Sequence, residues 1–94
     1  MKAILHRPKE RPSVIEVENS LVALQTVVGG YIETVTVTED VCLICNEEGI
    51  LLRLEPQKIL GRTFFGNVLL VGTEGDEFTD IPDEWADLWI PEEE

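Results

Sequence analysis

The sequence contains no apolar run that approaches the roughly 18 residues of a membrane-spanning helix. Its first segment, Met1–Pro8, starts with a basic residue and soon turns polar, so it lacks the longer apolar stretch of a signal peptide. A small-residue cleavage site is missing as well. These absences predict a cytoplasmic protein that does not bind membranes.

Positive charge is scarce and unevenly placed. The chain has 7 Lys and Arg residues against 19 Asp and Glu residues, which gives a formal net charge of −12. No Lys or Arg follows Arg62, whereas ten acidic residues do: Glu74, Asp76, Glu77, Asp80, Asp83, Glu84, Asp87, Glu92, Glu93 and Glu94. Direct binding to nucleic acid needs a basic patch, so we do not expect it. The charge instead favours a partner that presents positive charge.

The sequence also lacks the motifs of common enzyme classes. It has no Gly-x-Gly-x-x-Gly fingerprint, no phosphate loop and no nucleophile elbow. His6 is the single histidine and has no Ser, Cys or carboxylate at a telling spacing, so we expect it at the surface or at a strand edge. We therefore predict no catalytic residues and no cofactor.

Two cysteines, Cys42 and Cys45, form a Cys-x-x-Cys motif. A structural zinc site needs four ligands, and the chain has no second cysteine pair. Both cysteines lie in a segment that is typical of a strand, where residues three apart point to opposite faces. We interpret them as buried structural thiols and predict no metal site.

What the sequence does contain is enough for one small domain. Its 94 residues are 44% apolar, which argues against global disorder. A domain of this size buries roughly 60–65% of its unfolded surface, enough for one modest core. We expect a single domain over residues 1–94, with residues 90–94 frayed. Self-association would add stability, so a homo-oligomer remains open.

The first half of the chain alternates between strand and helix patterns. Asn19 or Ser20 is a suitable N-cap, Leu21, Leu24 and Val28 follow at helical spacing, and Gly29-Gly30 can end the helix. The segment 31–38 alternates with a period of two, which predicts a strand with Val35 and Val37 facing the core. The expected strands are 2–6, 13–17, 31–38 and 41–45, and the expected helix is 20–28.

The second half is less regular. Asn46–Gly49 is expected to be a hairpin loop, with Gly49 at a position that can take a positive φ. Ile50–Leu54 then returns as a strand or a short extended piece, and Pro56–Arg62 is either a helical turn or a loop. The segment 63–72 is expected to be a strand broken near Gly66-Asn67. The last expected element is a helix over 81–89, with Asp80 as its N-cap and Ile81, Trp85 and Trp89 on its apolar face. The predicted fold is therefore α+β, with one small antiparallel or mixed sheet of about five to six strands and two helices in the order β-β-α-β-β-β-β-α.

Four segments together carry a family pattern. They are Met1–Leu5, the block from Asn19 to Glu33 with its Val28-Gly29-Gly30-Tyr31-Ile32-Glu33 end, the block Ile44-Cys45-Asn46-Glu47-Glu48-Gly49, and the strand Gly66–Gly72 leading into Asp76-Glu77-Phe78-Thr79. With these segments most of the chain resembles the domain-of-unknown-function family numbered 3846, which occurs in low-GC Gram-positive bacteria, their phages and mobile elements. The chain departs from the pattern in a shortened middle and a very acidic end. The resemblance implies the fold layout and a phage or mobile-element setting, and it carries over no catalytic residue.

Two pairs of residues before the C-terminal segment are candidates for interaction. Tyr31 and Glu33 follow the Gly-Gly turn, where an exposed tyrosine can stack on a ligand or partner, although packing in the core or at an edge is the favoured interpretation of Tyr31. Glu47 and Glu48 lie on the predicted hairpin loop, which has too few ligands for a calcium site. A solvated loop tip is the plain interpretation, and contact with another protein is the functional one.

The acidic C-terminal segment is the most unusual feature. In the plain interpretation it is an amphipathic helix whose tryptophans fill the core and whose acids face water. In the functional one, Asp80, Asp83, Glu84 and Asp87 form an acidic recognition face that occupies a basic groove in a nucleic-acid-binding protein.

Three functions remain at this point. The first is a non-enzymatic acidic interaction module that binds a basic protein partner. The second is a small-ligand protein, such as a nucleotide-binding oligomer, whose anionic ligand would have to use Lys2, Arg7, Lys9, Arg11, Arg53, Lys58 or Arg62. The third is a small enzyme without a recognisable motif.

Overall fold

A computed structural model describes residues 1–89 of the chain. Their elements are β1 (Lys2–His6), β2 (Ser13–Glu16), α1 (Leu21–Val28), β3 (Ile32–Thr38), β4 (Val41–Asn46), β5 (Pro56–Ile59), β6 (Arg62–Phe65), β7 (Val68–Glu74), β8 (Glu77–Thr79) and α2 (Asp83–Trp89). The predictions that residues 90–94 fray and that the Trp89 side chain packs in the core lie outside the described part.

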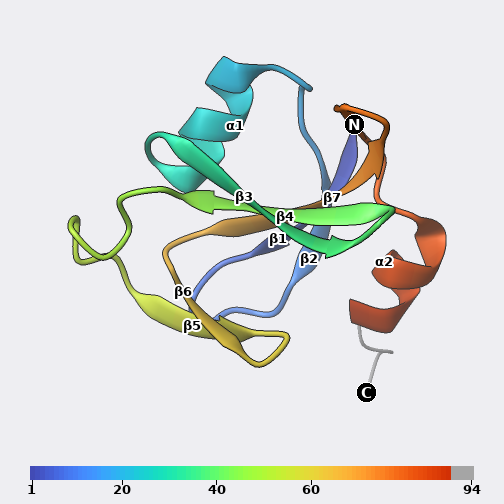
Figure 1. The fold of residues 1–94 in the computed structure, drawn as a ribbon. Coiled ribbons are helices and arrows are strands. Elements are labelled where there is room, and N and C mark those ends of the chain that lie inside the picture. Colours follow the sequence, from blue (N-terminus) through green and yellow to red (C-terminus); the bar gives the residue numbers. More distant parts are fainter. Residues whose placement is uncertain (90–94) are drawn as a thin grey trace.

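One antiparallel sheet organises the fold (Figure 1). Its strand order is β2-β1-β7-β4-β3, and the short β8 pairs with the end of β7. Strands β5 and β6 form a separate hairpin. The predicted α+β class, with a sheet of this size and two helices, is confirmed.

The sheet is the middle layer of the fold. Figure 1 shows α1 on one side of it and the β5–β6 hairpin with α2 on the other. The α1 side is an apolar cluster of alternate residues of the central strands, such as Leu5, Ile44 and Leu69, packed with Leu24 and Val28 of α1. The opposite cluster is made of the remaining alternate strand residues together with members of the hairpin and of the C-terminal segment: Ile4, Val41, Leu43, Cys45, Val68, Leu70, Ile59, Phe64 and Ile81, with Val35, Val37 and Trp85 partly buried against it. Because β4 is covered on both faces, all six of its residues are buried.

Helix α1 begins and ends where its sequence indicates. The Ser20 side chain accepts a hydrogen bond from the Ala23 amide at 3.2 Å, as an N-cap does. Gly29 adopts a left-handed conformation with φ 84°, and its amide donates to the Gln25 carbonyl at 2.8 Å. Leu21, expected on the buried face, is exposed at the first turn of the helix.

Two sequence-based predictions about buried residues have opposite outcomes. Cys42 and Cys45 are buried on opposite faces of β4, as the strand pattern predicts. The prediction for His6 is wrong, because its exposed fraction is 5%. Strand β1 lies between β2 and β7 inside the sheet, and His6 pairs with Val68 there, so neither a surface nor an edge position is available to it.

The segment between β4 and β7 differs most from expectation. Ile50–Leu54 is part of a series of turns rather than a strand, and Pro56–Arg62 contributes β5 and the tip of the β5–β6 hairpin instead of a helical turn or a loop. Gly49 does not have a positive φ. A Cβ atom there would lie 2.8 Å from the Phe65 carbonyl oxygen, so glycine is required by close packing against β6.

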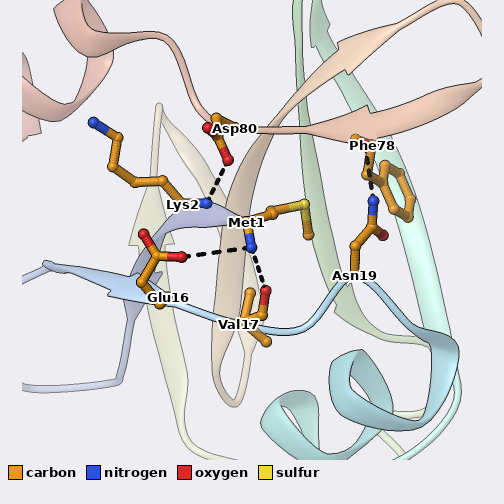
Figure 2. A network of polar contacts seen from close by, with 7 residues as sticks. All are labelled: Met1, Lys2, Glu16, Val17, Asn19, Phe78 and Asp80. Carbon is orange, nitrogen blue, oxygen red and sulfur yellow. Dashed lines mark hydrogen bonds and ion pairs between the residues drawn. The ribbon is translucent and has the colours of Figure 1, made fainter.

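The start of α2 also needs a correction. The Pro82 carbonyl accepts from the amides of Trp85 and Ala86, so Pro82 occupies the N-cap position that was predicted for Asp80. Asp80 instead accepts a hydrogen bond from the backbone amide of Lys2 at 2.7 Å, as Figure 2 shows. This bond fastens the end of β8 to β1. No helix among residues 1–89 is long and apolar enough to cross a membrane.

Candidate functional site

The pairing of β3 with β4 brings four candidate residues to one end of the sheet. Glu33 lies opposite Cys45 in this pair. The Glu47 amide donates to the Tyr31 carbonyl at 2.8 Å, which extends the same register by one residue beyond β4. Tyr31, Glu33, Glu47 and Glu48 are therefore neighbours, although they form two separate pairs in the sequence. All four are exposed.

Three of these residues line a hollow of about 380 Å³ between the end of β3–β4 and strand β6. We call it the acidic hollow, after Glu33, Glu47 and Glu48. The rest of its wall is made by residues of β3, of β4 and the loop after it, and of β6: Val35, Cys45, Asn46, Gly49, Ile50, Leu51, Arg62, Thr63, Phe64 and Phe65. Tyr31 lies beside the hollow and does not line it.

Asn46 fixes the segment that follows β4. Its side chain is buried, with an exposed fraction of 6%. Its Nδ2 donates to the Val28 carbonyl at 3.0 Å, and its Oδ1 accepts from the Glu48 amide at 2.7 Å. The last turn of α1 and the start of the loop are thus held by one side chain, which satisfies a helix-end carbonyl at the same time.

The loop 47–54 is closed by its own backbone hydrogen bonds. The amides of Leu52, Arg53 and Leu54 donate to carbonyls four, three and five residues earlier in the chain, at 2.9, 3.0 and 3.0 Å. The contact of Gly49 with Phe65 adds a fixed point on β6. A loop held by several internal hydrogen bonds and anchored at Asn46 and Gly49 presents its side chains in a defined arrangement.

This ordered loop exposes three consecutive large apolar side chains. The exposed fractions are 71% for Ile50, 80% for Leu51 and 51% for Leu52. Sequence reasoning placed these residues in a strand and missed them as a surface feature. Contiguous exposed apolar side chains rimmed by polar residues are typical of interaction sites. We call Ile50–Leu52 the apolar tip.

The electrostatics of the hollow are dominated by its acids. Burial raises the pKa of the Cys45 thiol, Glu33 raises it further, and Arg62 opposes them. Arg62 also lies over the Phe64 ring, 5.4 Å from its centroid. With three carboxylates and one guanidinium among its lining residues, the hollow favours a positively charged group of a ligand or partner. Among residues 1–89, no group of three or more His, Cys, Asp or Glu residues could hold a metal ion.

A second hollow, of about 560 Å³, lies between the β1–β2 connection, the end of α1 and residues 54–55 and 66–67. It contains Arg7 and Lys9, the cations that an anionic ligand would use. Each of them already forms an ion pair with a carboxylate. Arg7 Nη1 lies 3.7 Å from Glu10 Oε1, and Lys9 Nζ lies 3.1 Å from Glu55 Oε2. A phosphate would have to compete with these acids, so this hollow gives the nucleotide alternative little support.

The C-terminal candidate residues lie at the other end of the sheet. Thr79 pairs with Gly72, which pairs with Val41 at the start of β4, whereas the acidic hollow is at the end of β4. Asp80 is engaged by the Lys2 amide, and Asp83 by the Lys2 ammonium group at 2.8 Å. That hydrogen bond and charge raise the pKa of Lys2 and lower the pKa of Asp83.

Because of these contacts, only some of the C-terminal acids are available to a partner. Asp80 and Asp83 attach the C-terminal segment to β1, while Glu84 and Asp87 are exposed on α2. The eight predicted interaction residues therefore form two separate groups, and an apolar surface feature accompanies the group at the acidic hollow.

No curated protein and no solved structure matches the chain. A family model, described as a domain of unknown function (DUF3846), matches residues 1–92. The match spans nearly all of the 94 residues, including β3, β4 and the loop that carries the apolar tip. The chain therefore belongs to the DUF3846 family.

Proposed function

We propose that this protein is a non-enzymatic interaction module that binds a partner protein with a positively charged surface. The binding site is the apolar tip together with the acidic hollow. The observation that carries the proposal is the apolar tip, exposed on an ordered loop, whose Ile50 and Leu51 line the same hollow as Glu33, Glu47 and Glu48. Tyr31, exposed at 62%, extends the same end of the molecule.

The two parts of the site have different physical roles. Apolar side chains that become buried at the centre of an interface contribute affinity in proportion to the apolar area removed from water. The loop is already ordered by its backbone bonds, so binding costs little additional conformational entropy. The surrounding carboxylates attract a cationic surface and disfavour acidic ones, which speeds association and sets specificity.

We also propose a cellular setting for the protein. Because the sequence resembles a family of phages, mobile elements and their Gram-positive hosts, we place the protein in the bacterial cytoplasm, with a host protein as its partner. The net charge of −12 supports a basic partner over an acidic one.

Capture followed by titration tests the proposal. The full chain is immobilised and exposed to lysate of a low-GC Gram-positive bacterium in about 0.1 M salt, and the captured protein is identified, purified and titrated. The double variant Ile50→Ser/Leu51→Ser is compared with Leu21→Ser/Val22→Ser, which removes two exposed apolar side chains of α1.

We expect the loop variant to bind the partner at least about tenfold more weakly and the α1 variant to bind like the wild type. Raising the salt to about 0.5 M should weaken binding further. Capture of no basic protein, equal affinities for the two variants, or binding that does not respond to salt would each contradict the proposal.

A further inference from the structure

Strand β3 forms one edge of the sheet, and among the described residues it pairs with β4 alone. It is seven residues long, whereas the opposite edge strand β2 has four and follows Pro12. Proteins protect long edge strands with lysine, proline, a β-bulge or a covering segment. The sequence of β3, Ile-Glu-Thr-Val-Thr-Val-Thr, contains neither lysine nor proline, and its pairing with β4 is irregular only between Thr36 and Thr38. The regular part of this edge is therefore Ile32 to Thr36.

The register identifies the backbone groups that this edge offers. The Glu47 amide donates to the Tyr31 carbonyl, so Tyr31 and Glu47 are a hydrogen-bonded pair. Such pairs alternate with non-bonded pairs along antiparallel strands. Every second residue from Tyr31 therefore turns its backbone toward β4, and the residues between them, Ile32, Thr34 and Thr36, turn their N–H and C=O groups outward.

An apolar hollow follows this edge on the face that carries the β5–β6 hairpin. It has a volume of about 130 Å³, and its walls include Val35, Val37, Ile59, Leu60 and Phe64. The valines of β3 are half-buried, and Leu60 is exposed at 48%. A strand laid along β3 would place alternate side chains over this hollow, as in known cases of strand addition.

Charge decides between a second copy and a different partner. Two copies of β3 paired over their full length, Ile32–Thr38, would be centred on Val35, with Glu33 of each copy opposite Val37 of the other. What opposes this pairing is the charge of the whole molecule, because each copy carries a net charge of −12. Acids at both ends of the strand instead complement an extended segment with cationic ends and an apolar middle.

We propose that β3 accepts an extended segment of a basic partner as an additional antiparallel strand of the sheet. This inference rests on the proposed function and specifies how the partner binds. The added strand completes the hydrogen bonds of Ile32, Thr34 and Thr36, its apolar side chains enter the hollow over Val35 and Val37, and its basic ends face Glu33 and Glu39. The acidic hollow continues this groove, because the two hollows share Val35, Arg62 and Phe64 in their walls.

The test uses the peptide Lys-Thr-Val-Thr-Val-Thr-Lys with acetylated and amidated ends. Amide hydrogen exchange of the full chain is followed by NMR as the peptide is added. We expect slower exchange at Ile32, Thr34 and Thr36, and little change at Glu33 and Val35, which are bonded to β4 in the free protein. Methylation of single peptide nitrogens should weaken binding about tenfold at every second position and much less at the others.

A substitution in the protein provides a second test of strand addition. Thr34→Pro removes an outward amide and should weaken peptide binding about tenfold, whereas Thr34→Ala keeps the amide and should bind like the wild type. If Thr34→Pro does not fold, the methylated peptides still test strand addition on the wild-type protein. The inference would be overturned if the peptide did not bind at millimolar concentration, or if the protected amides lay outside β3. It would also be overturned if methylation weakened binding without alternating between successive peptide positions. A dimer in light scattering, with the same amides protected before peptide is added, would also overturn it in favour of a second copy.

The outcomes separate this inference from the proposed function. If the captured partner depends on Ile50 and Leu51 but leaves the β3 amides unprotected, the proposed function stands and strand addition fails. If the partner protects the β3 amides and binds the Ile50→Ser/Leu51→Ser variant as tightly as the wild type, strand addition stands and the role of the apolar tip fails.

Discussion

Asn46 donates a hydrogen bond from its buried Nδ2 to the carbonyl of Val28 at 3.0 Å, and so joins the end of β4 to the last turn of α1. Asn46→Ala leaves this buried carbonyl without its donor. We expect the free energy of unfolding to fall by about 1–3 kcal/mol. The amides of the loop 47–54 should also exchange faster, because the Asn46 Oδ1 no longer holds the Glu48 amide. Chemical denaturation and hydrogen exchange measure the two effects.

The matched control for this prediction is Asn19→Ala. Asn19 donates from its side chain to the Phe78 carbonyl at 2.9 Å, in an exposed position (Figure 2). Water can replace an exposed donor, so the loss should stay below about 1 kcal/mol. A loss for Asn19→Ala equal to that of Asn46→Ala would contradict the role assigned to Asn46.

Glycine at position 49 sets the distance between the loop and β6. In Gly49→Ala the new Cβ atom would lie 2.8 Å from the Phe65 carbonyl oxygen, so the loop must move away from β6. We expect a lower denaturation midpoint and changed NMR shifts through the loop 47–54. Gly61→Ala is the comparison, because its φ of 80° strains an alanine while no atom lies within 4 Å. Its shift changes should stay within the β5–β6 hairpin, and changes that reach the loop would contradict this account.

Sequence patterns predicted elements that depend on neighbouring residues. The caps of α1 at Ser20 and Gly29, the alternation in β3 and the buried run of β4 are all local signals, and the structure contains each of them. The opposite orientation of Cys42 and Cys45 follows from the same two-residue period.

The missed features depend on contacts between distant segments. Ile50–Leu54 has the composition of a strand, but the loop is closed by its own hydrogen bonds and by Gly49 against β6, and neither contact is visible in the order of residues. His6 has a polar side chain, which predicts a position at the surface or at a strand edge; its burial follows from the central position of β1, which depends on the pairing with β7.

The candidate site shows the same limit. Glu33 and Glu47 were each identified from the sequence, but their convergence requires the β3–β4 register. Arg62 reaches the acidic hollow only because the β5–β6 hairpin folds back onto the sheet, and no local motif indicates this.

Burial protects both thiols from reaction. It raises the pKa of Cys42 and of Cys45, so little thiolate is present near neutral pH. We expect alkylation by iodoacetamide at about pH 8 to be much slower in the native protein than in urea, as followed by mass spectrometry. The two thiols lie on opposite faces of β4, so mild oxidation should not join them within one chain. Rapid alkylation of the folded protein, or an intrachain disulfide, would contradict the burial of these residues.

The burial of His6 predicts how stability changes with pH. Burial lowers the pKa of His6 below its usual value of 6.5. As the pH falls below 6.5, the unfolded chain binds a proton at this residue before the folded chain does, so the free energy of unfolding decreases until the lowered folded pKa is reached. The ionised Asp83 also contributes to the free energy of unfolding, but over a lower pH range. Its pKa in the folded chain lies below 3.8, so this contribution is lost only as the pH falls through that range.

The comparison of wild type with His6→Gln isolates this effect, since both proteins carry the same carboxylates. Denaturation midpoints are measured at intervals from about pH 8 to about pH 5. We expect the wild type to lose stability relative to His6→Gln as the pH falls, with little relative change above about pH 7.5, where His6 is almost entirely neutral in both states. Parallel curves would show that the folded and unfolded chains protonate His6 alike. A relative gain for the wild type would require a charged His6 stabilised inside the fold, and either result would contradict the position assigned to this side chain.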